Sequence, residues 1–161
     1  MILYVLGISQ DGGYPQIGCN EICCNLAWER PELKKYPSSL AVVNQAQKKY
    51  WLFDITPDAK HQIQMLNSFG CSLSGIFITH AHIGHYMGLI NLGLEVMNLK
   101  EIPVYVMPRM RDFICNNSLL NQLINNNNIK LSTLPMGEEV SINNLLSVEA
   151  FNVPHRNELS E

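Results

Sequence analysis

The chain has 161 residues, of which 47% are hydrophobic and only 16% charged, a composition typical of one globular domain with a sizeable core. Eleven Lys and Arg against 14 Asp and Glu give a net charge of −3, and no basic stripe could follow a phosphate backbone, so we expect no nucleic-acid partner. The opening MILYVLG lacks a cationic lead-in, and no apolar run is long enough to span a bilayer, which predicts a cytoplasmic protein without a membrane partner.

The first third of the chain predicts a strand, a long loop and a hairpin. The apolar run 2–7 predicts the strand, and the Gly, Pro and Asn content of residues 9–24 indicates the loop. Residues 38–44 and 48–54 are rich in β-branched and aromatic side chains and are separated by a polar turn. This pattern favours an antiparallel hairpin whose second strand ends at Asp54.

Two helix-start signals follow the hairpin. Thr56 is suited to the N-cap position of a helix, and Pro57 is suited to its first turn. They predict a helix over about 57–69 that Gly70 closes. A buried strand is expected next, then a helix over 85–98 with one side formed by Met87, Ile90, Leu94 and Met97. The remaining expected elements are strands at 75–79, 103–107, 129–134, 138–142 and 146–154, and helices at 108–117 and 118–126.

Strands and helices alternate from residue 49 to about 107, and strands dominate both flanks. This order predicts an α/β fold with a mixed sheet. Neither a linker nor an internal repeat divides the sequence, so we expect a single domain over residues 1–161.

Three of the five histidines lie within ITHAHIGHYMG, residues 78–88. His80 and His82 are two residues apart at the end of a strand, a spacing that turns both rings to the same side, and His85 follows at the start of the next helix. Neutral imidazoles that converge in this way are good zinc ligands. A single His on an apolar element is more often a hydrogen-bonded core residue, but three within six positions favour a metal centre.

The sequence His80-Ala-His82-Ile-Gly84-His85 resembles the His-x-His-x-Asp-His motif of the metallo-β-lactamase superfamily, with Gly84 in place of Asp. LFDITPD and VPHRNE, which contains His155, resemble two further segments of that superfamily. VLGISQDGGYPQIGC, THAHIGHYMGL and PVYVMPRM are most similar to the protein B family of pyrroloquinoline quinone biosynthesis. The resemblance implies an αβ/βα sandwich of which only the N-terminal half to two-thirds is present, so that the domain is incomplete.

The resemblance also implies a set of metal ligands. His80, His82 and His155 would form the first metal site, and His85 would belong to a second. Gly84 has no side chain to replace the missing carboxylate, so one ion is expected in preference to two. Zinc is the expected ion, with iron or manganese as alternatives.

Other residues have two open interpretations. Asp54 is either the acceptor that orients a ligand imidazole or a loop cap, and Glu158 is either a group near the metal or a solvated charge. The family places a structural zinc on cysteines near Cys19, Cys23 and Cys24, but their spacing favours reduced thiols. Cys71 and Cys115 are expected in the core, and His61 on the surface.

We expect a hydrolase of a small-molecule substrate in which a His-bound metal ion activates water. Two alternatives stay open. One is an enzyme of cofactor biosynthesis, of the pyrroloquinoline quinone type, that uses a redox metal such as iron or copper. The other is a truncated remnant without catalytic activity that retains a metal shell or serves only as an interaction module. Because half of a sandwich leaves an apolar sheet face uncovered, we also expect self-association.

Overall fold

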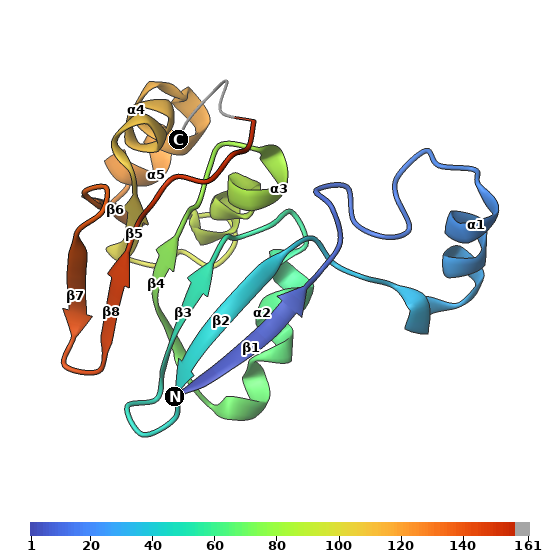
Figure 1. The fold of residues 1–161 in the computed structure, drawn as a ribbon, viewed down its shortest axis with the longest axis horizontal. Coiled ribbons are helices and arrows are strands. Elements are labelled where there is room, and N and C mark those ends of the chain that lie inside the picture. Colours follow the sequence, from blue (N-terminus) through green and yellow to red (C-terminus); the bar gives the residue numbers. More distant parts are fainter. Residues whose placement is uncertain (157–161) are drawn as a thin grey trace.

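The computed structural model describes residues 1–156, which fold around a six-stranded mixed sheet with the strand order β1-β2-β3-β4-β5-β6 (Figure 1). Pairing is antiparallel from β1 to β3 and parallel from β3 to β6. The predicted hairpin and the predicted α/β class with a mixed sheet are therefore confirmed. The strands are β1 (Ile2–Gly7), β2 (Ser39–Asn44), β3 (Lys49–Phe53), β4 (Ser72–Phe77), β5 (Ile102–Val106) and β6 (Ile129–Thr133).

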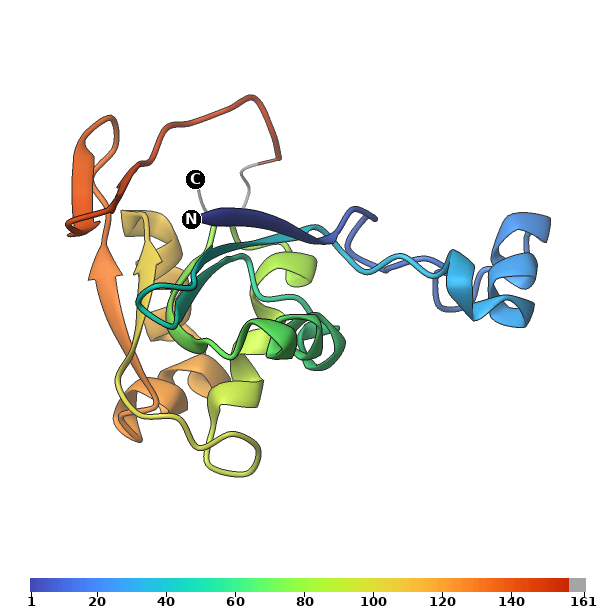
Figure 2. The same ribbon diagram turned by 90° about the horizontal axis from the view of Figure 1, so that it is seen from below.

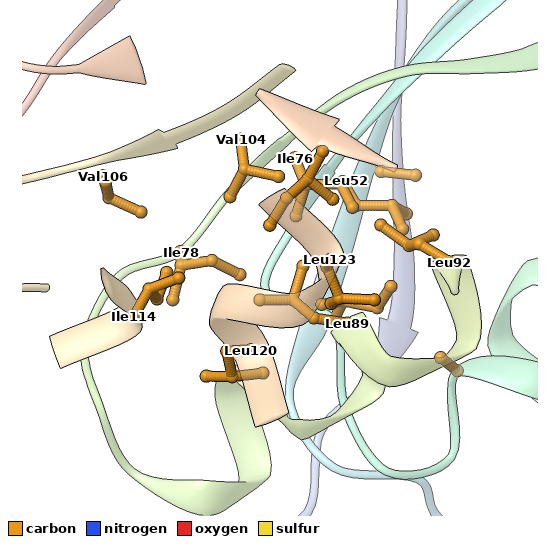
Figure 3. Close-up of a cluster of buried hydrophobic side chains, with 14 of the residues drawn as sticks. Leu52, Ile76, Ile78, Leu89, Leu92, Val104, Val106, Ile114, Leu120 and Leu123 are labelled. Carbon is orange, nitrogen blue, oxygen red and sulfur yellow. The ribbon is translucent and has the colours of Figure 1, made fainter. Parts of the chain in front are cut away.

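One face of the sheet packs against helices, and the main core lies between the two layers. Alternate strand residues such as Leu52, Ile76 and Val104 meet Leu89, Ile114 and Leu120 from the helices, as Figure 3 shows. Close-packed apolar side chains of this kind supply most of the free energy of folding. The covering elements are α2 (Ala59–Met65), η2 (Asn67–Phe69), α3 (Ile83–Tyr86), η3 (Met87–Leu92), α4 (Pro108–Asn116) and α5 (Ser118–Asn125).

A small hairpin of β7 (Glu139–Asn143) and β8 (Leu146–Glu149) covers part of the other face. Its apolar side chains pack against Trp51, Phe77 and Leu134. The rings of Phe53, Phe77 and Tyr105 stack across neighbouring strands, with centroids 4.6 and 4.7 Å apart. The hairpin leads into the segment that carries His155.

Residues between β1 and β2 form an arm that projects from the sheet in both Figure 1 and Figure 2. It contains α1 (Ile22–Glu29) and the turn η1 (Pro31–Leu33). A loop was expected over residues 9–24, and α1 was not predicted. The reason is that the two buried side chains of α1, Cys24 and Ala27, are small, and Glu21 at its N-cap makes no side-chain capping bond.

The prediction of a helix over 85–98 is wrong. The chain instead forms α3, the 3₁₀ segment η3 and a series of turns, and Leu94 is 59% exposed. Gly88 packs so closely on the preceding segment that a Cβ there would lie 2.2 Å from the carbonyl oxygen of Thr56. Its backbone N–H donates to the Ile55 carbonyl, so contacts with the end of β3 determine the path of this segment.

Two further boundaries differ from the expected ones. The last strand, β8, ends at Glu149 and is followed by irregular chain, and α2 begins at Ala59, two residues later than predicted. Thr56 still serves the start of this helix, because its hydroxyl accepts a hydrogen bond from the Asp58 N–H. Within residues 1–156, no helix has both the length and the apolar character needed to cross a membrane.

The exposed outer face of β1 predicts self-association. Leu3 and Val5 are 65% and 54% exposed, and β1 is an edge strand of the sheet formed by the described residues. Light scattering should therefore give a mass well above the 18.2 kDa of one chain. The double variant Leu3→Lys/Val5→Lys should shift this mass toward the monomer, whereas a monomeric parent chain would contradict the prediction.

Candidate metal centre

The candidate centre lies where the parallel strands β3 and β4 end. Their register places Phe53 beside Phe77, and the Asp54 N–H donates to the Phe77 carbonyl at 2.8 Å. Parallel strands deliver the residues that follow them to one edge of the sheet, where α/β folds commonly place their ligand sites. Asp54 and His80 are thereby brought to the same edge.

Three imidazoles converge at this edge. Ligand nitrogens of His80, His82 and His155 all lie within 4.8 Å of one another. The Nε2 atom of His80 is 2.9 Å from Nδ1 of His82, and Nε2 of His155 is 3.3 Å from the same Nδ1. Two donors bound to one zinc ion at tetrahedral angles are about 3.4 Å apart, so the observed spacing suits a single small cation.

A hydrogen-bond chain sets the orientation of the His80 ring. The Thr79 hydroxyl lies 2.9 Å from Oδ2 of Asp54 and 2.8 Å from Nδ1 of His80. Because the Asp54 carboxylate can only accept, the hydroxyl donates to it and accepts from the Nδ1–H of His80. The Nε2 atom of His80 therefore presents a lone pair to the other two rings, the state that a metal ligand requires.

The resulting donor set fits a metal ion. The lone pair of His80 faces Nδ1 of His82, and Nε2 of His155 faces the same atom, so a single proton cannot link all three nitrogens well. One cation among them would satisfy all three, and neutral imidazole is a preferred zinc ligand.

His85 is oriented by the same carboxylate. Its Nδ1 atom lies 2.7 Å from Oδ2 of Asp54, and its ring centroid is 4.1 Å from that of His80. Its Nε2 atom lies 3.4 Å from Oδ1 of Asp11, a residue of the loop after β1. Among the described residues, His85 is not one of the three converging ligands, and its role as a ligand of a second ion stays a prediction.

Burial and charge act differently on the two neighbouring histidines. Burial lowers the pKa of His80 to about 4, and the positive charge of His85 acts in the same direction, so His80 is neutral at pH 7. Burial opposes the charging of His85, but the hydrogen bond and charge of Asp54, together with Asp11, outweigh burial and raise the pKa of His85. In the metal-free protein, the stability linked to His80 is lost as the pH falls from 6.5 toward 4.

The backbone around Asp54 is closely constrained. Asp54 is 7% exposed and has a positive φ of 62°, a conformation that Asp tolerates better than most residues. The Ile55 N–H donates to the His85 carbonyl at 2.9 Å, which ties the end of β3 to the histidine segment. These bonds hold Asp54 between Thr79 and His85.

An apolar cavity of about 330 Å³ opens beside the three histidines. His80 and His155 line one end of it, and Phe53, Phe77 and Phe151 contribute aromatic walls. Among the described residues of its lining, Glu149 contributes the carboxylate. The cavity is therefore suited to an apolar group presented to the centre.

The other predicted residues lie away from this centre or outside the described residues. The five cysteines are free thiols; Cys23 is exposed, Cys24 is buried, and within residues 1–156 the three arm cysteines do not converge as a set of ligands. Cys71 packs against the main core, and His61 is exposed and stacks on Tyr36. Glu158 lies outside the described residues.

Two residues of the centre were not predicted from the sequence. Thr79 precedes the motif directly and could have been found as a hydroxyl next to a ligand. Asp11 is distant in sequence from the histidine motif. The sequence feature that points to it is Gly84, whose missing side chain leaves room for Asp11.

Two proteins with related sequences each match slightly more than half of this chain. Ribonuclease Z from Prochlorococcus marinus (strain MIT 9215) is 36% identical over 88 residues, which cover 52% of this chain and 28% of that protein. Coenzyme PQQ synthesis protein B from Acinetobacter baylyi is 32% identical over 101 residues, 57% of this chain and 33% of that protein. Each match covers about a third or less of the relative's own length.

Solved structures share the fold over more of the chain. Zinc-bound PqqB from Methylobacterium extorquens superposes with a TM-score of 0.82 at 24% identity over 96% of this chain, and this chain spans 52% of that one. A diphosphatase from the PhnP family gives a TM-score of 0.65 at 22% identity over 87% of this chain and 52% of that one. The similarity at these identities is one of fold.

A family model described as the beta-lactamase superfamily domain matches residues 51–160, more than half of the chain. This region contains the last three residues of β3, all of β4 to β8, and all the histidines of the candidate centre. The chain belongs to the metallo-β-lactamase superfamily.

Proposed function

We propose that this chain is a metal-dependent hydrolase whose ion is bound by His80, His82 and His155. The observation that carries the proposal is the convergence of three imidazoles from two distant segments within 4.8 Å. The zinc named in the solved PqqB structure is a property of that protein, and it supports zinc as the first ion to test here.

The residues around the ion have separate tasks in this proposal. A bound zinc ion would lower the pKa of a coordinated water toward about 7 and stabilise negative charge on a substrate oxygen. Thr79 and Asp54 hold the His80 ring so that its Nε2 faces the ion position. His155 is exposed, which leaves this side of the centre open to solvent and substrate.

The apolar cavity supports a substrate that carries an apolar or aromatic group. Phe53, Phe77 and Val148 would contact such a group while its scissile bond lies near His80 and His155. An RNA substrate, as the name of ribonuclease Z suggests, is less compatible with a net charge of −3 and with Glu149 in the cavity lining. A small ester, amide or phosphodiester fits the cavity better.

A second candidate is an oxidation in cofactor synthesis, which the likeness to coenzyme PQQ synthesis protein B favours. Imidazole ligands accept iron and copper as well as zinc. Metal analysis of protein purified without added zinc separates the two candidates: bound zinc favours the hydrolase, and bound iron or copper favours the oxidation.

Replacement of one ligand should abolish tight metal binding. His82→Ala removes the nitrogen that faces both other rings, so we expect zinc affinity to fall at least about 100-fold, measured by competition with a chelating dye. His61→Ala, which removes an exposed histidine on α2, is the matched control and should bind zinc like the parent. Unchanged affinity in His82→Ala would exclude the proposed centre.

The same pair of variants tests hydrolysis. We expect the zinc-loaded parent and His61→Ala to cleave p-nitrophenyl esters or phosphodiesters, with activity lost on chelation and restored by zinc. His82→Ala should be inactive. Cleavage that survives complete chelation would show that the reaction does not depend on the metal.

Loss of the Asp54 charge should lower the pKa of His85. NMR titration of the metal-free protein should show a lower His85 pKa in Asp54→Asn than in the parent, because Asp54 favours the charged ring. Since this pKa is raised above 6.5 in the folded chain, the associated stability is present below 6.5 and lost as the pH rises through the raised value. Asp58→Asn is the control, and equal His85 titration curves in Asp54→Asn and parent would refute the assignment.

A further inference from the structure

We propose that Asp11 supplies the carboxylate that the histidine motif lacks at position 84, and that Asp11 and His85 bind a second metal ion beside the three-histidine centre. The inference rests on the proposed function, because the second ion would act next to the first. It changes the expectation drawn from Gly84, which was a single ion.

Asp11 occupies the space that a side chain at position 84 would fill. A Cβ built on Gly84 would lie 2.6 Å from the Cα, Cβ and Cγ atoms of Asp11, closer than real Cβ contacts. A carboxylate at position 84 and the present position of Asp11 are therefore incompatible without a shift of the loop. The glycine leaves room for an acidic side chain that arrives from the loop after β1.

The donor atoms of Asp11 and His85 face each other. Oδ1 of Asp11 is 3.4 Å from Nε2 of His85, while the other ring nitrogen lies 2.7 Å from Asp54. A charge-assisted hydrogen bond is usually about 2.7 to 2.9 Å long, whereas two donors on one tetrahedral ion are about 3.4 Å apart. The Asp54 bond to Nδ1 leaves Nε2 as the coordinating atom.

The position of the pair suits an ion beside the first one, because the ring of His85 lies next to that of His80, with their centroids 4.1 Å apart. The His85 side chain is 16% exposed and that of Asp11 is 41% exposed, so an ion can enter from solvent. The imidazole and carboxylate donors are both accepted by zinc.

Backbone hydrogen bonds fix the loop on both sides of Asp11. The N–H groups of Ile8 and Ser9 donate to the Tyr36 carbonyl at 3.0 Å, and the Gly13 N–H donates to the Gln10 carbonyl at 2.8 Å. Asp11 therefore lies in a defined turn instead of a free loop, which reduces the entropy lost when an ion binds.

A competing explanation needs no metal. A proton on Nε2 of His85 would make an imidazolium between Asp54 and Asp11, and the contact would then be an ion pair alone. The two explanations differ in the number of ions that the chain binds and in which variant changes that number.

The experiment measures zinc stoichiometry on the full chain. Protein stripped with a chelator is titrated with zinc in a calorimeter, and bound zinc is counted by elemental analysis after gel filtration. The parent should bind two ions per chain. Asp11→Ala and the isosteric Asp11→Asn should keep the first ion at unchanged affinity and bind the second at least about tenfold more weakly.

Two further variants complete the test. Asp112→Ala removes an exposed carboxylate on α4 and should bind two ions like the parent. Gly84→Ala keeps every ligand residue but forces the Asp11 loop to move, so it should also lose the second ion.

Some results would overturn the inference. If the parent binds one ion, or if Asp11→Ala binds two as tightly as the parent, Asp11 and His85 form only an ion pair. Two ions in Gly84→Ala at parental affinity would also contradict it. If the parent binds no zinc at all, the proposed function itself fails, and this result is distinct from the loss of the second ion alone.

Discussion

One buried carboxylate, that of Asp54, accepts hydrogen bonds from both parts of the segment that carries the clustered histidines. It accepts from the backbone and hydroxyl of Thr79, and through this hydroxyl it orients His80. It also accepts from Nδ1 of His85. A buried charge is costly unless it is fully paired, so these bonds stabilise Asp54 while they determine which nitrogens of the two histidines are available.

The topology of the sheet makes this arrangement possible. Parallel pairing of β3 and β4 brings Asp54 next to Thr79 and His80, although 25 residues separate Asp54 from Thr79. The turns of α3 and η3 then fold back on the end of β3, with Gly88 in contact with Ile55 and Thr56. The hairpin of β7 and β8 covers the outer face of the same strands and directs the chain to His155.

Local features of the centre could be predicted from the sequence, whereas its long-range contacts could not. The spacing of His80, His82 and His85 at a strand end is a local pattern and gave their placement. The prediction of His155 as a metal ligand depended on resemblance, because no local pattern links it to His80. Asp11 was not predicted, because its contact with Gly84 joins two loops that only the folded sheet brings together.

In the fold, too, local sequence patterns predicted some elements, and tertiary contacts determined another. The strands and the helices over 108–126 follow local apolar patterns and turn signals, and the structure contains each of them, with β4 and β8 ending earlier than expected. The expected helix over 85–98 failed because apolar residues at helical spacing are also compatible with a 3₁₀ segment, and the close approach of Gly88 to Thr56 decided between the two. Tertiary contact outweighed the local pattern there.

The proposed function requires that imidazoles from residues 80–82 and residue 155 share one cation. Crystals grown with zinc and measured on both sides of the zinc absorption edge test it most directly. We expect an anomalous peak within bonding distance of Nε2 of His80, Nδ1 of His82 and Nε2 of His155. A peak bound elsewhere, or a zinc-free triad with the His155 ring turned away from His82, would contradict it.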